Sequence, residues 1–148
     1  MVDESAVETK TEFTISAGGI APTAPLALEP IPDDSVLYMR VHDQFIDNNG
    51  KLRPGVFKNR GRGMSTDWNK YSTPEETRAR ARIPAMNGVV SLVVERVRGV
   101  KEQTVEHTPY EAEPPHPAHV DVCGEKDVET RLLLLEIVGW EIKNKSAV

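Results

Sequence analysis

Residues 88–97 read GVVSLVVERV, and this stretch decides the fold that we expect for the chain. Six of its ten residues are valine or leucine, and β-branched side chains favour extended backbone. Because apolar residues occupy both alternating faces, the pattern is typical of a strand that is covered on both sides. We therefore expect residues 88–97 to form the central strand of a sheet.

Further strands are predicted before and after this one. Residues 35–42 are rich in strand formers, and residues 119–123 alternate polar and apolar side chains. Residues 100–106 are expected to continue from the central strand as a second one. Residues 64–68 are expected at an edge of the sheet, and residues 52–57 as a short return strand.

Two helices are predicted from the signals at their ends. Thr73 and Glu76 have capping-box spacing, and a helix is expected from there to about residue 82. Asp127 is expected to cap a second helix that ends near residue 138. The apolar positions of that helix, at helical spacing, are Val128, Leu132, Leu135 and Val138.

These elements together predict the α+β class: a small single domain over residues 35–142. We expect a mostly antiparallel sheet of four to five strands with two helices on one face, and Trp140 folded back onto the core. Residues 1–34 are acidic and proline-rich, which predicts a flexible, extended or disordered tail. Residues 143–148 are expected to fray.

Charge is distributed unevenly along the chain. The net charge is −5, but residues 51–82 carry nine basic and three acidic side chains, a balance of +6 that leaves −11 for the remainder. Such asymmetry indicates a local anion-binding surface. The alternative is a solvated basic face that only balances acidic segments elsewhere.

Cysteine content and hydropathy indicate the compartment. The single cysteine, Cys123, leaves no disulfide within the chain, which suits a reducing cytosol. The first residues lack the cationic and apolar regions of a secretory signal. The longest apolar run, residues 132–135, is too short to cross a bilayer. We expect a cytoplasmic protein without a membrane association.

A basic segment, KLRPGVFKNRGRG, occupies residues 51–63 after the turn signal NNG at residues 48–50. Residues 60–63, RGRG, resemble a short RGG element of nucleic-acid-binding proteins. The spacings of phosphate-binding glycine loops are absent from the sequence. We expect this segment to contact an anion or a partner. The expected contact residues are Arg53, Lys58, Arg60 and Arg62.

Weak catalytic candidates lie on the predicted strands. Histidine serves as a general acid or base, and arginine grips phosphate through two nitrogens. If the strands pair, the candidates converge together with Asp67. An arginine on the first strand followed by a Ser-Thr element loosely resembles ADP-ribosyltransferase-like toxins. The candidates are Arg40, His42, Ser65 and His119.

His116 and His119 stand three residues apart in a proline-rich segment. Zinc-binding histidine pairs on a helix are usually four residues apart. We therefore predict no metal site and no cofactor, with His116 in a loop and His119 partly buried.

The order of several short motifs resembles a group of small uncharacterised bacterial proteins. The motifs are Leu37-Tyr38 followed by Arg40, the segment MSTD at residues 64–67, Pro74-Glu75-Glu76 and Pro117-Ala118-His119. The resemblance covers about two-thirds of the chain and supplies no catalytic residues. Such proteins occur as companions of larger bacterial proteins, often in defence or conflict settings. The resemblance therefore implies an accessory role.

Three functions follow as hypotheses. The preferred one is a non-enzymatic accessory or protein-interaction module, a companion of a larger bacterial protein in antiviral defence. The N-terminal tail and the proline-rich segment at residues 108–118 are of the kind that lies on a partner. One alternative is a small enzyme of ADP-ribosyltransferase-like or nuclease-like toxin type, which we favour less. The other is a nucleic-acid-binding domain that uses residues 51–63.

Overall fold

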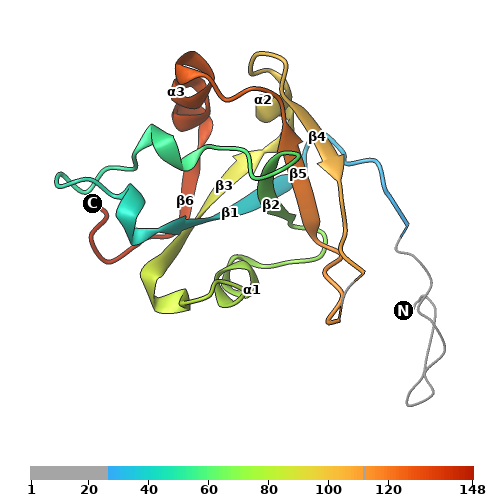
Figure 1. The fold of residues 1–148 in the computed structure, drawn as a ribbon, viewed down its shortest axis with the longest axis horizontal. Coiled ribbons are helices and arrows are strands. Elements are labelled where there is room, and N and C mark those ends of the chain that lie inside the picture. The colour runs from blue at the N-terminus through green and yellow to red at the C-terminus, as the bar shows by residue number, and fades with distance from the viewer. Residues whose placement is uncertain (1–26, 112) are drawn as a thin grey trace. The chain divides into compact units, whose positions relative to one another are not determined.

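The computed structural model describes residues 27–111 and 113–148 (Figure 1). The chain divides into two compact units, one of residues 30–107 and 118–148 and the other of residues 1–29 and 108–117. Because the described residues begin at residue 27, most of the tail predicted for residues 1–34 lies outside them. Within the smaller unit, Tyr110 and His116 exchange two backbone hydrogen bonds of 3.0 Å.

The larger unit contains an antiparallel sheet to which the described residues contribute six strands, in the order β4-β5-β2-β1-β3-β6. The strands are β1 (Val36–His42), β2 (Met64–Trp68), β3 (Asn87–Val93), β4 (Thr104–His107), β5 (His119–Cys123) and β6 (Gly139–Ile142). The α+β class and the antiparallel sheet are confirmed, but the expected four to five strands are too few. The sixth strand, β6, contains Trp140 and is only four residues long. The strand predicted for an edge, β2, lies inside the sheet between β1 and β5.

β1 and β3 form the longest pairing of the sheet. It extends over seven positions, and Leu37 and Leu92, both fully buried, stand opposite each other. The strand predicted for residues 88–97 is correct only up to Val93. The chain then turns into α2 (Val94–Arg98), whose first two backbone N–H groups, those of Val94 and Glu95, bond to Ser35 O and Asp33 O. The spacing of the valines fits the alternation of a strand as well as the repeat of a helix, so the pattern alone did not separate strand from helix.

Three α-helices occur in the part of the chain that the structure describes, against two predicted: α1 (Pro74–Ala79), α2 and α3 (Val128–Ile137). The capping box at the start of α1 is formed, with Thr73 Oγ1 accepting from Glu76 N at 3.1 Å and Glu76 Oε1 accepting from Thr73 N at 2.9 Å. Instead of the return strand predicted for residues 52–57, the chain forms a short 3₁₀ turn, Pro54–Val56. Proline lacks the N–H that a strand ladder needs.

The hydrophobic core lies on the face of the sheet that is covered by α2 and α3, while α1 lies on the opposite face (Figure 1). The expectation of helices on one face only is therefore wrong. Of the predicted apolar positions of the second helix, Leu135 and Val138 pack against the core, but Val128 and Leu132 are exposed, and Leu134 is fully buried in their place. Residues 132–135 of α3 are four consecutive leucines, which occupy more than one side of the helix, so the apolar spacing does not select a face.

The segment after β6 contacts the sheet. The side chain of Asn144 is buried and donates to Val41 O at 2.9 Å and to Asp43 Oδ1 at 2.8 Å. The backbone N–H of Val148 bonds to Gly50 O. Across residues 27–111 and 113–148, no helix combines the length and the apolar character that crossing a membrane requires.

Candidate anion-binding site

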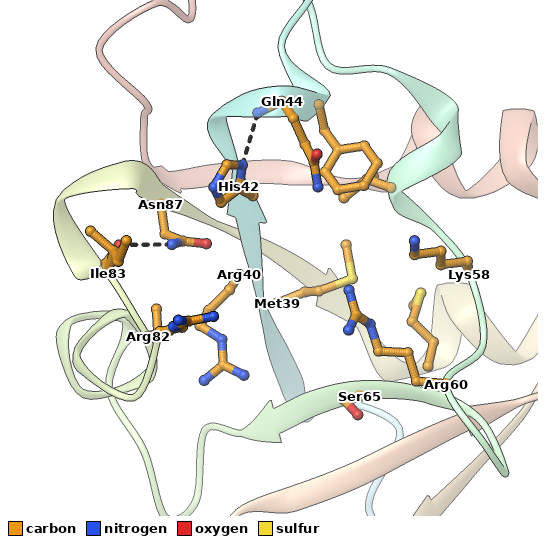
Figure 2. A pocket seen from close by; sticks show the side chains of 14 residues that line it. Met39, Arg40, His42, Gln44, Lys58, Arg60, Ser65, Arg82, Ile83 and Asn87 are labelled. Atoms are coloured by element: carbon orange, nitrogen blue, oxygen red, sulfur yellow. Dashed lines mark hydrogen bonds between the residues drawn. The ribbon is translucent and has the colours of Figure 1, made fainter.

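A hollow opens where β1 and β2 stop pairing. The register between these two strands covers only Leu37 with Trp68 and Tyr38 with Asp67, whereas β1 pairs with β3 over seven positions. Beyond Tyr38 and Asp67 the strands diverge, and a cavity of about 490 Å³ lies between them (Figure 2). This volume falls within the range of pockets that hold small molecules or the anchor residues of peptides.

The described side chains that line this hollow are of two main kinds, cationic and apolar, and none of them is an aspartate or a glutamate. The cations are Arg40, Lys58, Arg60 and Arg82. The apolar side chains nearest the core are Met39, Phe45, Val56 and Met64, all of which belong to the core cluster or pack against it. The neutral polar or titratable residues of the lining are His42, Gln44, Ser65 and Asn87.

The alternation of β1 gives the hollow two halves. Consecutive strand residues point to opposite faces, so Met39 faces the core and Arg40 faces the other side. Figure 2 shows Arg40 and Arg82 on one side of β1, and Met39, Lys58 and Arg60 on the other. The hollow therefore presents cations on both sides of one strand.

A tight turn brings Arg60 to the hollow. Its backbone N–H bonds to Gly63 O at 2.8 Å, and Gly61 between them has a φ of +67°, a backbone conformation that glycine adopts without strain. Lys58 lies 5.7 Å from the centroid of the Phe45 ring, a cation–π distance. The predicted basic segment thus places two of its cations beside an apolar wall.

The cations of the hollow lack carboxylate partners among the residues described. Arg40 Nη1 donates only to Thr77 O, at 3.5 Å, and the guanidinium groups of Arg60 and Arg82 have neither an ion pair nor a hydrogen bond there. Unneutralised cations in a concave site raise the local concentration of anions. The hollow therefore carries an excess of positive charge.

Several cations elsewhere on the larger unit have carboxylate partners. The salt bridges include Arg80 with Asp67, Arg98 with Asp33 and Lys101 with Glu129, at 2.7, 2.5 and 2.9 Å. Arg62 pairs with Glu106. Lys51, Arg96 and Lys145, outside the hollow, have no salt bridge to a described residue either, so what distinguishes the hollow is that four such cations line one cavity.

His42 has a defined orientation in the lining. Its Nδ1 accepts a hydrogen bond of 3.0 Å from the backbone N–H of Gln44. In the neutral ring the proton consequently resides on Nε2, which can donate to a ligand. This contact makes His42 a donor at the rim of the hollow.

Asp67, at the end of the hollow where β1 and β2 pair, is hydrogen-bonded to other residues of the domain. Thr77 Oγ1 and Arg80 Nη1 donate to Asp67 Oδ2 at 2.8 and 2.7 Å, and Ser72 Oγ accepts from Arg80 Nη1 at 3.0 Å. Asp67, Ser72 and Thr77 are all buried. This network fastens α1 to β2, so Asp67 has a structural role.

The structure places the catalytic candidates on one face of adjacent strands. The register aligns Tyr38 with Asp67 and Asp67 with His119, so β1, β2 and β5 lie side by side as expected. His42 and His119, however, are two strands apart and offset by four residues, roughly 13 Å along the strand direction at ~3.3 Å per residue. The two histidines are therefore too far apart to act as one acid–base pair.

Of the residues predicted to contact an anion, Lys58 and Arg60 line the hollow, whereas Arg53 and Arg62 do not. Arg82 lines it without having been singled out from the sequence. The only signal for it was the basic run RARAR at residues 78–82, which does not distinguish Arg82 from the internally bonded Arg80.

Comparison of the chain with models of protein families, with curated proteins and with solved structures finds no match. No group of three or more His, Cys, Asp or Glu side chains in the described ranges is placed to hold a metal ion. A function for the domain has to be inferred from the geometry of the hollow.

Proposed function

We propose that this domain is a non-enzymatic interaction module that binds an acidic segment of a larger partner protein in the hollow between β1 and β2. The observation that carries this proposal is the set of four cations without carboxylate partners in one concave site. Carboxylates form strong charge-assisted hydrogen bonds with guanidinium groups. The motif resemblance supports a bacterial defence or conflict complex as the setting, and the single cysteine, Cys123, suits the cytoplasm as the location.

The apolar part of the lining favours a protein ligand over nucleic acid. Met39, Val56 and Met64 offer a wall for an apolar side chain, which a phosphate backbone does not have. Phe45 is the one aromatic side chain in the lining, whereas single-strand binders stack bases on several. The negative charge of the remaining chain would also repel a long polyanion.

A catalytic role has less support from the geometry. His42 and His119 are separated, and Asp67 is engaged with Thr77 and Arg80. The remaining candidates, Arg40 and Ser65, bind or orient an anion without supplying a general base.

The test compares two threefold variants with the same change in charge. One removes cations of the hollow, Lys58→Gln, Arg60→Gln and Arg82→Gln, and the other removes exposed cations outside it, Lys51→Gln, Arg96→Gln and Lys145→Gln. The partner is isolated with the wild-type protein from native cells, and its affinity for each variant is measured in solution. We expect the hollow variant to lose at least about tenfold in affinity, as for one lost charge-assisted contact, and the control to bind like the wild type.

Nucleic acid is tested in the same series. Affinity for random duplex DNA is measured against salt, because phosphate contacts give a log–log slope of about −0.9 for each phosphate. Tight, salt-steep DNA binding that the hollow variant loses would replace the proposed function. Equal partner binding by the two variants would remove the hollow from it.

A further inference from the structure

The half of the hollow on the Met39 side combines an apolar wall with two cations. Met39, Val56 and Met64 are 5%, 7% and 2% exposed, so each presents a small apolar surface to the hollow while the rest of its side chain packs in the core. Lys58 and Arg60 stand on the same side of β1 as Met39 (Figure 2). A ligand that fills this half must carry an apolar group and a negative charge close together.

This hollow is bounded along the direction of β1. At one end, the pairing of Tyr38 with Asp67 joins the two strands. At the other end stands the 3₁₀ turn Asp43–Phe45, which His42 caps through Gln44. A bond of 2.7 Å from Arg53 N to Phe45 O fixes the next segment of the chain against that turn. Such a bounded site admits the end of a chain more readily than a segment that continues in both directions.

Backbone groups of β1 also face the gap. Val36 O accepts from Asn69 N, so Val36 directs its polar backbone groups toward β2. Strand residues alternate in this direction, and Arg40 therefore directs its N–H and C=O the same way. The register between β1 and β2 stops at Tyr38, which leaves the Arg40 groups facing the hollow. They are placed to bond an extended peptide, as in recognition by strand addition.

We infer that this half of the hollow binds the C-terminal residue of the partner segment, with an apolar side chain against Met39, Val56 and Met64 and its α-carboxylate between Lys58 and Arg60. The inference rests on the proposed function and specifies which part of the partner enters. A terminal residue carries its carboxylate and its side chain on the same carbon atom, so it brings a negative charge and an apolar group to this half of the hollow together. The acidic residues before it then face Arg40 and Arg82 on the other side of β1.

The two methionines allow the apolar wall to accept side chains of different shapes. Methionine side chains are unbranched and adapt to irregular shapes, so leucine, isoleucine, valine and phenylalanine are all acceptable last residues. Selection therefore depends on the free carboxylate and on apolarity more than on the shape of the side chain.

Labelled peptides test the inference directly. The probe is fluorescein-Glu-Glu-Gly-Ser-Leu with a free carboxylate, and its matched controls are the C-terminal amide and a peptide in which serine replaces the last leucine. We expect amidation to weaken binding at least about tenfold, because a charge-assisted contact is lost. The variant Lys58→Gln, Arg60→Gln should bind the acid and the amide equally weakly. The control variant Arg96→Gln, Lys145→Gln should discriminate between them like the wild type.

The outcomes separate this inference from the proposed function. Equal binding of acid and amide, with binding still lost in the threefold hollow variant, overturns the chain-end inference and leaves the proposed function standing. Binding of N-acetyl-leucine as tight as that of the peptide also overturns it, because the ligand is then a small amphipathic acid. Absence of any difference between the wild type and the threefold hollow variant, for peptides and partner alike, overturns both.

Discussion

Two groups of charged side chains adjoin on β1 and β2, and they differ in how their charges are satisfied. Around Asp67, the carboxylate accepts from Thr77 and Arg80 and is buried. In the hollow, which begins at Ser65, two positions before Asp67 on β2, Arg60 and Arg82 have no such partners among the described residues. The first group stabilises the fold, whereas the second is available to a ligand.

The difference shows that polar residues in a cluster do not by themselves indicate a site. Ser65 and Asp67 are separated by one residue of the same strand, but only Ser65 lines the hollow. What distinguishes them is the set of partners that the fold supplies. The following predictions test that distinction, beginning with the sheet that holds both groups in place.

The largest effect is expected in the core of the sheet. Leu92 is fully buried opposite Leu37, and Leu92→Asp places a carboxylate there without a partner. This costs several kcal/mol, which is comparable to the whole stability of a small domain. We expect the variant to lose its cooperative thermal transition in circular dichroism. A folded variant with an unchanged Tm would show that β3 does not support the sheet.

The next effect is expected in the buried network. Asp67→Ala removes the buried carboxylate that accepts from Thr77 Oγ1 and Arg80 Nη1, and we expect a loss of about 1–3 kcal/mol in the free energy of unfolding. The matched control is Arg62→Gln, which breaks an exposed ion pair with Glu106 and should cost at most about 1 kcal/mol. Urea denaturation measures both. Equal losses would mean that the buried network is not stabilising.

Lys126 is intermediate between the ion-paired group around Asp67 and the unpaired cations of the hollow, because its hydrogen-bond acceptors are neutral oxygens. Its Nζ donates to Asn59 Oδ1, Val122 O and Gly124 O, at 2.8, 3.1 and 2.8 Å. Burial lowers the pKa of Lys126 to about 8, from 10.5 for an ordinary lysine, so between these values the folded state binds fewer protons than the unfolded state. The contribution of this group to stability must then rise as the pH increases from about 8 to 10.5.

We therefore expect the urea midpoint of the wild type to gain, relative to that of Lys126→Gln, between pH 8 and pH 10. The comparison with the variant cancels the contributions of other groups that titrate in this range. An equal or smaller midpoint difference at pH 10 would show that the lysine is not destabilised by its charge.

The smallest effect on stability is expected in the hollow. Lys58→Gln, Arg60→Gln and Arg82→Gln together remove no carboxylate partner, so the free energy of unfolding should change by less than about 0.5 kcal/mol or rise slightly as repulsion is relieved. The control is Lys51→Gln, Arg96→Gln and Lys145→Gln. If the hollow variant loses as much stability as Asp67→Ala, its cations have a structural role and the contrast between the two groups fails.

Local signals predicted much of the secondary structure. The capping box at Thr73 and the strand alternation at residues 119–123 are properties of adjacent residues, and both elements are present. The helix at Val94 was missed, because valines at this spacing suit a strand as well as a helix. Its formation depends on distant backbone bonds to Asp33 and Ser35.

The candidate site was predicted only in part. Lys58 and Arg60 were identified from local charge, and both line the hollow. The divergence of β1 from β2 depends on the register of the sheet, which short motifs do not specify. Arg82 approaches Arg40 only after folding, and the pairing that satisfies Arg62 with Glu106 joins segments 44 residues apart. The partners of a charge, which distinguish a site from a structural contact, are set by the tertiary fold.

The most direct test is a titration of the ¹⁵N-labelled protein with hexaglutamate, followed by the backbone amide shifts. We expect the largest changes at Met39–Phe45, Val56–Arg60, Met64–Ser65 and Ala81–Asn87, which border the hollow. The variant Lys58→Gln, Arg60→Gln, Arg82→Gln should lose these changes, and the variant Lys51→Gln, Arg96→Gln, Lys145→Gln should keep them. Changes centred on Lys51, Arg96 or Lys145, or unaltered in the hollow variant, would contradict an anion site between β1 and β2.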